Sequence, residues 1–105
     1  MNKIKIGFTT GVFDMFHIGH LNLLIEAKKN CDFLIAAVTT DEETYRVKKK
    51  FPIIPFEERA KIVEAIKVVD KVVPEDNVDK IVSFQKYKFD IIFKGDDWKG
   101  SKKWN

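Results

Sequence analysis

Residues 10–20 read Thr-Gly-Val-Phe-Asp-Met-Phe-His-Ile-Gly-His, and this stretch decides the fold of the chain. Before it, Ile4, Ile6 and Phe8 stand at every second position, an alternation that is typical of a β-strand. After it, apolar residues recur at helical spacing as far as Asn30, a residue type that often ends helices. The stretch is therefore predicted to join a strand to a helix, with its two histidines at the start of the helix.

The rest of the chain continues this alternation of strands and helices. Residues 32–39 are a continuous apolar run, which is typical of a strand buried on both faces of a parallel sheet. Patterning predicts further strands at 68–73, closed by Pro74, and at 89–93, and further helices at 56–67 and 77–87. Their spacing turns these side chains inward: Ile62, Val63, Ile66, Val78, Ile81, Val82 and Phe84. The order predicts an α/β fold, a doubly wound parallel sheet that binds ligands beyond the carboxyl ends of its strands.

One connection is long for so compact a chain. We expect residues 40–55 to form a loop that begins at the carboxyl edge of the sheet. The loop carries three consecutive lysines at positions 48–50, the one tight cluster of basic residues. A solvated loop is the simplest interpretation, but its place at the ligand edge favours a clamp for phosphate.

The two histidines, His17 and His20, are three residues apart at the start of the predicted helix. The free N–H groups and the dipole of a helix N-terminus attract anions, and imidazoles there donate hydrogen bonds to phosphate oxygens. We expect Gly19 to leave room for a phosphate and Gly11 to permit a tight turn. A metal site built from Asp14 and the histidines is the alternative, but no fourth ligand lies nearby in the sequence.

Length and composition exclude several classes of protein. The 105 residues suffice for one domain with a modest core, and 19 basic against 16 acidic residues give a net charge of +3, too mild for a protein that coats nucleic acid. A single cysteine, Cys31, excludes an internal disulfide and fits a reducing compartment. No apolar run approaches the ~20 residues of a membrane span. We therefore expect a cytoplasmic protein that binds neither nucleic acid nor a membrane.

The stretch Gly11–His20 resembles the G-x-F-D-x-x-H-x-G-H signature of the cytidylyltransferases. The likeness continues in residues 39–42, 57–59, 66–70 and 95–100, in family order, and is strongest to the branch that acts on glycerol 3-phosphate. The resemblance implies a Rossmann-like nucleotidyltransferase fold. It also implies transfer of a cytidylyl group from CTP to a phosphorylated small alcohol, with release of pyrophosphate and no covalent enzyme intermediate. Mg²⁺ would be carried mainly by the triphosphate, and the enzyme would be a homodimer.

The resemblance also assigns roles to particular residues. By analogy, His17 and His20 hold the CTP phosphates and stabilise the transition state together with Lys50. The other residues of the nucleotide site would be Thr10, Gly11, Val12, Phe13, Gly19 and Asp97. The residues that contact the acceptor substrate would be Lys48, Lys80 and Trp98, and no protein side chain is assigned to a metal. For Arg59, contact with a ligand and an ion pair on the helix surface with Glu57 or Glu58 both stay open.

The chain departs from the family pattern at its end. The family continues to an Arg-Thr-x-x-Ile-Ser-Thr-Thr motif, whereas this sequence stops at Asn105. We therefore expect one cytidylyltransferase-like domain, residues 1–105, without the C-terminal strand and helix. Two alternatives remain: an adenylyltransferase of the same superfamily that uses ATP, and a nucleotide-binding module without turnover. The histidine motif also matches class I aminoacyl-tRNA synthetases, which need a much longer chain.

Overall fold

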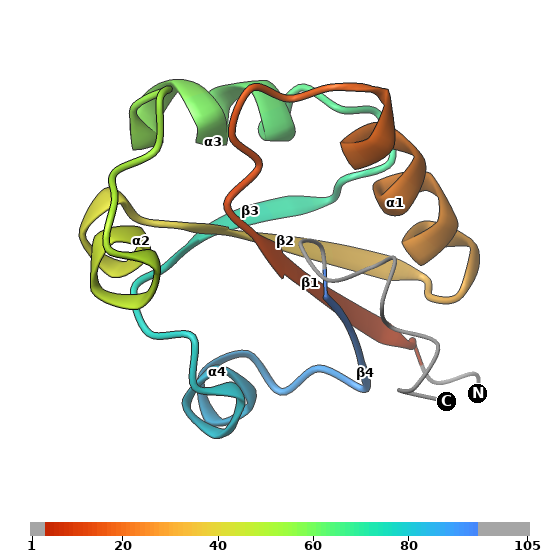
Figure 1. Ribbon diagram of the computed structural model, residues 1–105. Coiled ribbons are helices and arrows are strands. Elements are labelled where there is room, and N and C mark those ends of the chain that lie inside the picture. Colours follow the sequence, from red (N-terminus) through yellow and green to blue (C-terminus); the bar gives the residue numbers. More distant parts are fainter. Residues whose placement is uncertain (1–3, 95–105) are drawn as a thin grey trace.

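The computed structural model describes residues 4–94, which form one parallel sheet with helices around it (Figure 1). The strands lie in the order β3-β2-β1-β4. Their bounds are Ile6–Gly11 for β1, Phe33–Thr39 for β2, Lys71–Glu75 for β3 and Ile91–Lys94 for β4. The helices are α1 (Ile18–Lys29), α2 (Asp41–Lys48), α3 (Phe56–Glu64) and α4 (Lys80–Tyr87). The predicted α/β class and parallel sheet are confirmed.

Strand register brings the functional stretch to one edge of the sheet. Gly11, the last residue of β1, pairs with Val38 of β2, and Thr39 pairs with Glu75 of β3. All pairings are parallel, so the carboxyl ends of these strands meet at the same edge. The helix α2 lies beyond that edge in Figure 1. The signature stretch 10–20 leaves the sheet there, as expected for this fold class.

The central strand β2 is buried on both of its faces, as its apolar run predicted. Leu34 and Val38 pack in a cluster with Leu24 of α1 and Val63 of α3. Ile35 belongs to a second cluster on the opposite face. The other members of that second cluster are Phe8, Ala37, Val73 and Phe89, with Tyr87 of α4 packed against them. The helices α1 and α3 therefore cover one face of the sheet, and α4 covers the other (Figure 1).

The prediction of a loop over residues 40–55 is wrong for the first half of this range, because the helix α2 occupies Asp41–Lys48. The hydroxyl of Thr40 caps this helix by accepting a hydrogen bond from the N–H of Glu43. Acidic residues in the first turn and basic ones in the last turn complement the helix dipole. The helix has eight residues and hardly any apolar stripe, so hydrophobic periodicity does not reveal it.

Three further predictions need correction in detail. The third strand begins at Lys71 and includes Pro74, which a strand at the sheet edge tolerates because its missing N–H faces no partner. On α3, Val63 is fully buried, whereas Ile62 is 44 % exposed. On α4 the predicted inward residues are all exposed, Ile81 to 68 %, and the buried residue is Ser83. A short helix on a sheet face buries only one narrow stripe. Among the described helices, none is long and apolar enough to span a membrane.

Candidate functional site

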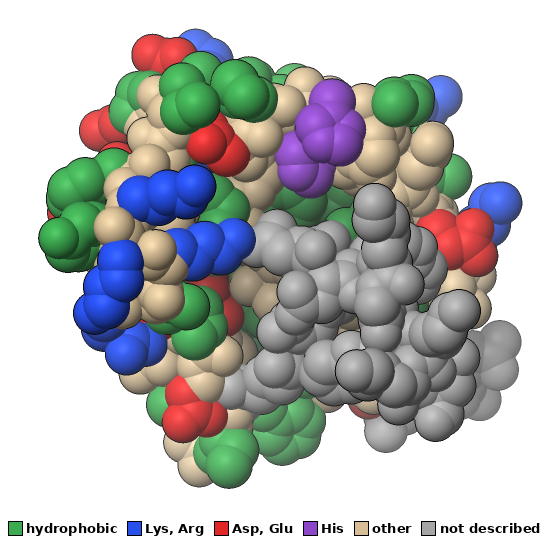
Figure 2. Space-filling view, viewed as in Figure 1, with side chains coloured by type: hydrophobic (Ala, Val, Ile, Leu, Met, Phe, Trp, Pro, Cys, Tyr) green, Lys and Arg blue, Asp and Glu red, His purple; other side chains and the backbone are tan. Residues whose placement is uncertain are grey.

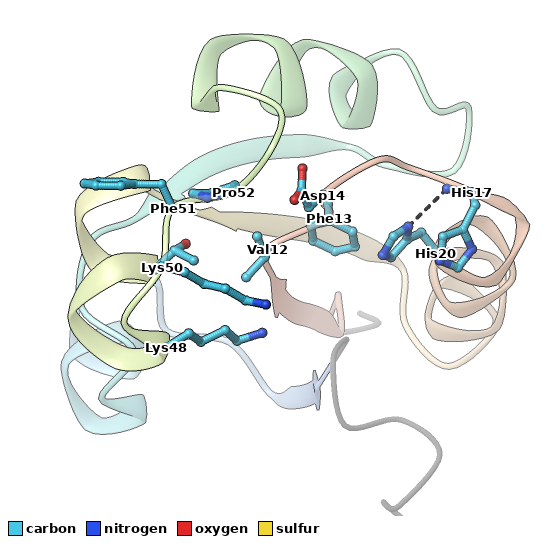
Figure 3. A pocket seen from close by; sticks show the side chains of 10 residues that line it. Val12, Phe13, Asp14, His17, His20, Lys48, Lys50, Phe51 and Pro52 are labelled. Atoms are coloured by element: carbon cyan, nitrogen blue, oxygen red, sulfur yellow. Dashed lines mark hydrogen bonds between the residues drawn. The ribbon is translucent and has the colours of Figure 1, made fainter.

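A pocket of about 220 Å³ opens at the carboxyl edge of the sheet, between the start of α1 and the end of α2 (Figure 3). Six of the predicted site residues line it: Val12, Phe13, His17, His20, Lys48 and Lys50. The remaining lining residues are Asp14, Thr44, Phe51 and Pro52. The volume lies below the ~300–1,000 Å³ of pockets that enclose a whole drug-sized ligand. It is suited to a group of the size of a phosphate chain.

The two histidines form a reciprocal cap at the start of α1. His17 is the N-cap residue, and its Nδ1 accepts a hydrogen bond from the N–H of Gly19 at 2.9 Å. Nδ1 of His20 accepts from the N–H of His17 at 3.1 Å (Figure 3). A neutral imidazole whose Nδ1 accepts carries its proton on Nε2. Backbone hydrogen bonds thus select the Nε2–H tautomer in both rings, and Nε2–H is a donor.

Aromatic side chains hold the His20 ring in place. Phe13 meets it edge-on, with ring centroids 5.6 Å apart, and the centroid of the Phe16 ring lies 5.2 Å from that of His20.

The backbone turns sharply between β1 and α1. Phe13 is 1 % exposed and has a φ of 54°, a left-handed conformation that is unusual for a bulky residue. Met15 also has a positive φ, of 50°. The turn that was expected at Gly11 is therefore made two to four residues later, and no glycine within residues 4–94 has a positive φ.

Gly19 lies against the imidazole of His17. A Cβ atom added at this position would lie 2.7 Å from Cε1 of His17, closer than real Cβ contacts come. The small residue therefore makes room for the imidazole of His17. That it also leaves room for a phosphate stays a prediction.

Lys48 and Lys50 reach the pocket from the side opposite the histidines. Lys48 ends α2, and Lys49 follows in the left-handed conformation with a φ of 64°. Figure 3 shows the Lys48 and Lys50 side chains extending toward the histidines, and Figure 2 shows basic side chains and the histidine pair on either side of this edge. Two cations, two imidazole donors and the N-terminus of a 12-residue helix surround one pocket. Such an arrangement favours a polyanion.

Asp14 is engaged by the backbone of the segment that follows α2. Its carboxylate oxygens accept from the N–H groups of Ile53 at 2.8 Å and Ile54 at 2.9 Å. Burial raises the pKa of Asp14, but these two hydrogen bonds, the charge of Arg59 and the N–H of Met15 together hold it below its ordinary value. Both oxygens are used, which counts against the alternative of a metal ligand. Within the described residues 4–94, no three His, Cys, Asp or Glu side chains are grouped so as to hold a metal ion.

Arg59 contradicts both interpretations that the sequence left open. It is 1 % exposed, so it neither lies on the helix surface nor lines the pocket. Its guanidinium donates to the carbonyl oxygens of Val12, Thr39 and Ile54 and pairs with the carboxylate of Asp41 at 2.6 Å. The spacing of positions 56, 59 and 63 on one face of α3 is the sequence signal for this burial.

Two buried glutamates lie behind the pocket, and sequence patterning missed both. Glu75 accepts from the Ser83 hydroxyl at 3.1 Å, and Thr10 contacts the same carboxylate at 3.5 Å. Burial is the main cause that raises the pKa of Glu75. Glu43 accepts two hydrogen bonds from Arg46, which lower its pKa, and one from the N–H of Val78. The structure therefore places Thr10 beside Glu75 and outside the pocket lining.

The remaining predicted residues are partly outside the described structure. Gly11 is buried at the end of β1 and does not line the pocket. Lys80 begins α4, but its side chain is not among those that the structure describes. Asp97 and Trp98 lie outside the described residues. Their assigned roles therefore stay predictions.

Comparison with known proteins agrees with this geometry. The sequence model of the family described as cytidylyltransferase-like matches residues 8–105. Glycerol-3-phosphate cytidylyltransferase of Bacillus spizizenii is 44% identical over 98 residues, which cover 92% of this chain and 75% of the relative. The enzyme of the same name from Bacillus subtilis is 40% identical over the same coverage.

More distant relatives share the fold and part of the sequence. The bifunctional protein HldE of Yersinia pestis is 39% identical over 98 residues, which cover 90% of this chain and 20% of that protein. The crystal structure of the lipopolysaccharide core biosynthesis protein from Thermoplasma volcanium superposes with a TM-score of 0.78 at 34% sequence identity. That match covers 86% of this chain and 73% of the other.

Proposed function

The chain belongs to the cytidylyltransferase-like family of nucleotidyltransferases, and from this premise we propose that it transfers a cytidylyl group from CTP to a phosphorylated small alcohol. The products are a CDP-alcohol and pyrophosphate. Glycerol 3-phosphate is the proposed acceptor, because two relatives that carry its name match at 44% and 40% identity.

One observation carries the proposal: His17 and His20 face Lys48 and Lys50 around a single pocket at the start of α1. The Nε2–H groups of the histidines and the ammonium groups of the lysines are donors of the kind that phosphate oxygens accept. Val12 and Phe13 form the wall between the two pairs. Position and charge are what phosphoryl-type transfer chiefly requires of a protein.

In the proposed reaction, an oxygen of the acceptor phosphate attacks the α-phosphorus of CTP. The bond from that phosphorus to the pyrophosphate oxygen breaks on the opposite side, and pyrophosphate leaves with the electron pair. Negative charge builds on the phosphate oxygens as this bond breaks. His17, His20 and Lys50 are the proposed catalytic residues, because preorganised donors stabilise charge that develops in the transition state.

Mg²⁺ is proposed to enter with the triphosphate. When bound, it would neutralise phosphate charge. The residues of the pocket fit an ion that the triphosphate carries. The pocket presents lysines and imidazoles, and the carboxylate oxygens of Asp14 accept hydrogen bonds from the N–H groups of Ile53 and Ile54. Asp97 and Trp98 are proposed, from the family signature alone, to contact nucleotide and acceptor, as is Lys80 for the acceptor phosphate. We also propose that the protein is a homodimer, which the family resemblance supports. We propose a cytoplasmic location as well, which the unpaired Cys31 supports.

Thermal unfolding in the presence of Mg²⁺ and, separately, CTP, ATP, GTP or UTP tests which nucleotide the protein binds. A ligand at a hundred times its Kd stabilises by about 2.7 kcal/mol, enough to raise the Tm by several degrees. We expect CTP alone to do so, followed by pyrophosphate release when glycerol 3-phosphate is added. A preference for ATP would assign the protein to adenylyl transfer. CTP binding without release of pyrophosphate from CTP, whichever phosphorylated alcohol is added, would indicate a binding module.

A further inference from the structure

The segment that carries Lys50 is anchored at both of its ends. We call residues 48–54 the lysine segment; all but its first residue lie outside helices and strands. It provides four of the residues that line the pocket: Lys48, Lys50, Phe51 and Pro52. The N–H groups of Ile53 and Ile54 donate to Asp14, and the carbonyl of Ile54 accepts from Arg59 at 2.7 Å. At the other end of the segment, the N–H of Lys49 donates to the carbonyl of Tyr45 at 2.8 Å and the Phe51 ring stacks on that of Tyr45. The contacts of Asp14 and Arg59 therefore fix the end that follows Pro52.

Arg59 connects this end of the segment to the rest of the site. Its Nη1 donates to the carbonyl of Val12 at 2.6 Å and to that of Thr39 at 2.8 Å. Its Nη2 pairs with Asp41, the first residue of α2. The acceptors therefore come from the signature stretch, the end of β2, the start of α2 and the lysine segment. All four of these pieces of chain lie at the carboxyl edge.

A buried guanidinium is tolerated only when its charge and its donors are compensated. Asp41 supplies the one carboxylate, and the three carbonyls fix the plane of the fork. The ring of Phe56 lies 5.8 Å from the guanidinium carbon and adds a cation–π contact. Lysine presents a single ammonium without a planar fork, so it cannot replace this set of directed donors.

We infer that Arg59 is a positioning residue: together with Asp14 it fixes the lysine segment against the signature stretch, so that Lys48 and Lys50 face the two histidines. Arg59 does not line the pocket, and therefore acts through the segment that it holds. The consequence for catalysis rests on the proposed function. The positioning itself does not, and it is testable without any substrate.

The structure offers a matched pair of variants for this test, Asp41→Asn and Asp70→Asn. Both carboxylates have a side-chain exposure of 32%, pair with a cation (Arg59 at 2.6 Å and Lys28 at 2.5 Å) and accept from a backbone N–H. Asp70 receives the N–H of Leu34, near the amino end of β2 and remote from the pocket. The two variants change carboxylates of equal exposure in different places. The Arg59 side chain is buried whereas that of Lys28 is 29% exposed, so the free energy of unfolding is measured for both.

Limited trypsin digestion under native conditions measures how often the lysine segment opens. Trypsin cleaves after lysine, and the lysines at positions 48–50 are exposed. When opening is fast, the cleavage rate reports the population of the open form. We expect Asp41→Asn to raise cleavage at these bonds about tenfold over Asp70→Asn, with both rates corrected for the measured free energy of unfolding. Arg59→Lys should behave like Asp41→Asn, and Asp14→Asn serves if Arg59→Lys does not fold.

Equal corrected cleavage rates in Asp41→Asn and Asp70→Asn would overturn the inference, because Arg59 would then serve only global stability. The same variants are next melted with Mg²⁺ and CTP. We expect the CTP-induced rise in Tm to persist in Asp70→Asn and to fall in Asp41→Asn. Selective cleavage with no response to CTP even in the unmodified chain would refute the proposed function and leave the positioning role standing.

Discussion

At the scale of single residues, the site depends on which atom of each imidazole faces the backbone. Nδ1 of His17 and of His20 accepts a backbone N–H, so Nε2 carries the proton of each neutral ring. The same two side chains thus cap α1 and provide donors for an anion. Each imidazole therefore has two roles, the cap of α1 through Nδ1 and the proposed phosphate contact through Nε2–H, and substitutions can test the two roles separately.

Replacing His17 separates the two roles. His17→Ser replaces the Nδ1 acceptor with a side-chain oxygen that caps helices well, whereas His17→Ala has no cap acceptor, at a cost of about 1 kcal/mol in the free energy of unfolding. Neither variant retains the imidazole donor. By comparison with the loss of one oxyanion donor, we expect both to lose about 3 kcal/mol of transition-state stabilisation. Urea unfolding and the rate of pyrophosphate release measure the two quantities. Full activity in His17→Ser would remove the imidazole from the mechanism.

Gly19→Ala tests the space that glycine leaves for the His17 ring. The added Cβ would lie 2.7 Å from Cε1 of His17 and should displace the ring. Alanine also favours the helix by roughly 1 kcal/mol over glycine, so little net stability should be lost. We expect activity to fall while the Tm changes little. Asn22→Ala, at an exposed position of the same helix, is the control and should keep its activity. Unchanged activity in Gly19→Ala would contradict the contact.

At the scale of elements, two buried carboxylates hold the helices α2 and α4 to their neighbours, a strand in one case and the connection between β3 and α4 in the other. Glu75 at the end of β3 holds Ser83 of α4, and Glu43 of α2 accepts the N–H of Val78. Both helices are short, and their own apolar residues are largely exposed. Polar contacts therefore do much to hold α2 and α4 in place beside the sheet.

The raised pKa of Glu75 gives stability a pH dependence. A carboxyl whose pKa is higher in the folded than in the unfolded chain stabilises the fold below its unfolded value, near 4.5, and loses this contribution as the pH rises through its folded value. Glu75→Gln imitates the protonated form. We expect it to melt at a higher temperature than the unmodified chain near neutral pH, with the gain shrinking toward pH 4.5. Thermal melts over this range check the sign, and a variant that is less stable at neutral pH would reverse it.

At the scale of the whole molecule, stability depends on the clusters that cover both faces of the sheet. Val63 of α3 is fully buried against α1 and β2, whereas its neighbour Ile62 is 44 % exposed. Helical spacing alone predicts that both face inward. Their different burial follows from how α3 lies on the sheet.

The adjacent pair Val63 and Ile62 makes a direct comparison. Val63→Ala removes two buried methyl groups and leaves a cavity, so it should lower the free energy of unfolding by about 2 kcal/mol. Ile62→Ala, on the exposed side, should lower it by less than about 0.5 kcal/mol. Urea unfolding of both variants measures the difference. Equal losses would mean that the face assigned to α3 is wrong.

The sequence by itself determined the features that depend on neighbouring residues. Alternation and helical spacing place the first strand, the histidines and α1, and the apolar run places β2 between two layers. Residues 10–20 and 48–50 are therefore identifiable as parts of one anion site from their local patterns and their position in the predicted fold. Local patterns miss α2, which is eight residues long and mostly polar. They find α4 but not its inward face, because Ile81, Val82 and Phe84 are exposed and Ser83 is buried.

Only the tertiary structure decided which distant groups complete that site. Arg59 finds its acceptors at Val12, Thr39, Asp41 and Ile54, and Asp14 finds its donors about forty positions further along the chain. Spacing on α3 can show that Arg59 faces inward, but not what it meets there. A buried charge must be satisfied by whatever groups the fold brings within hydrogen-bond reach, and those come from segments that no local pattern connects.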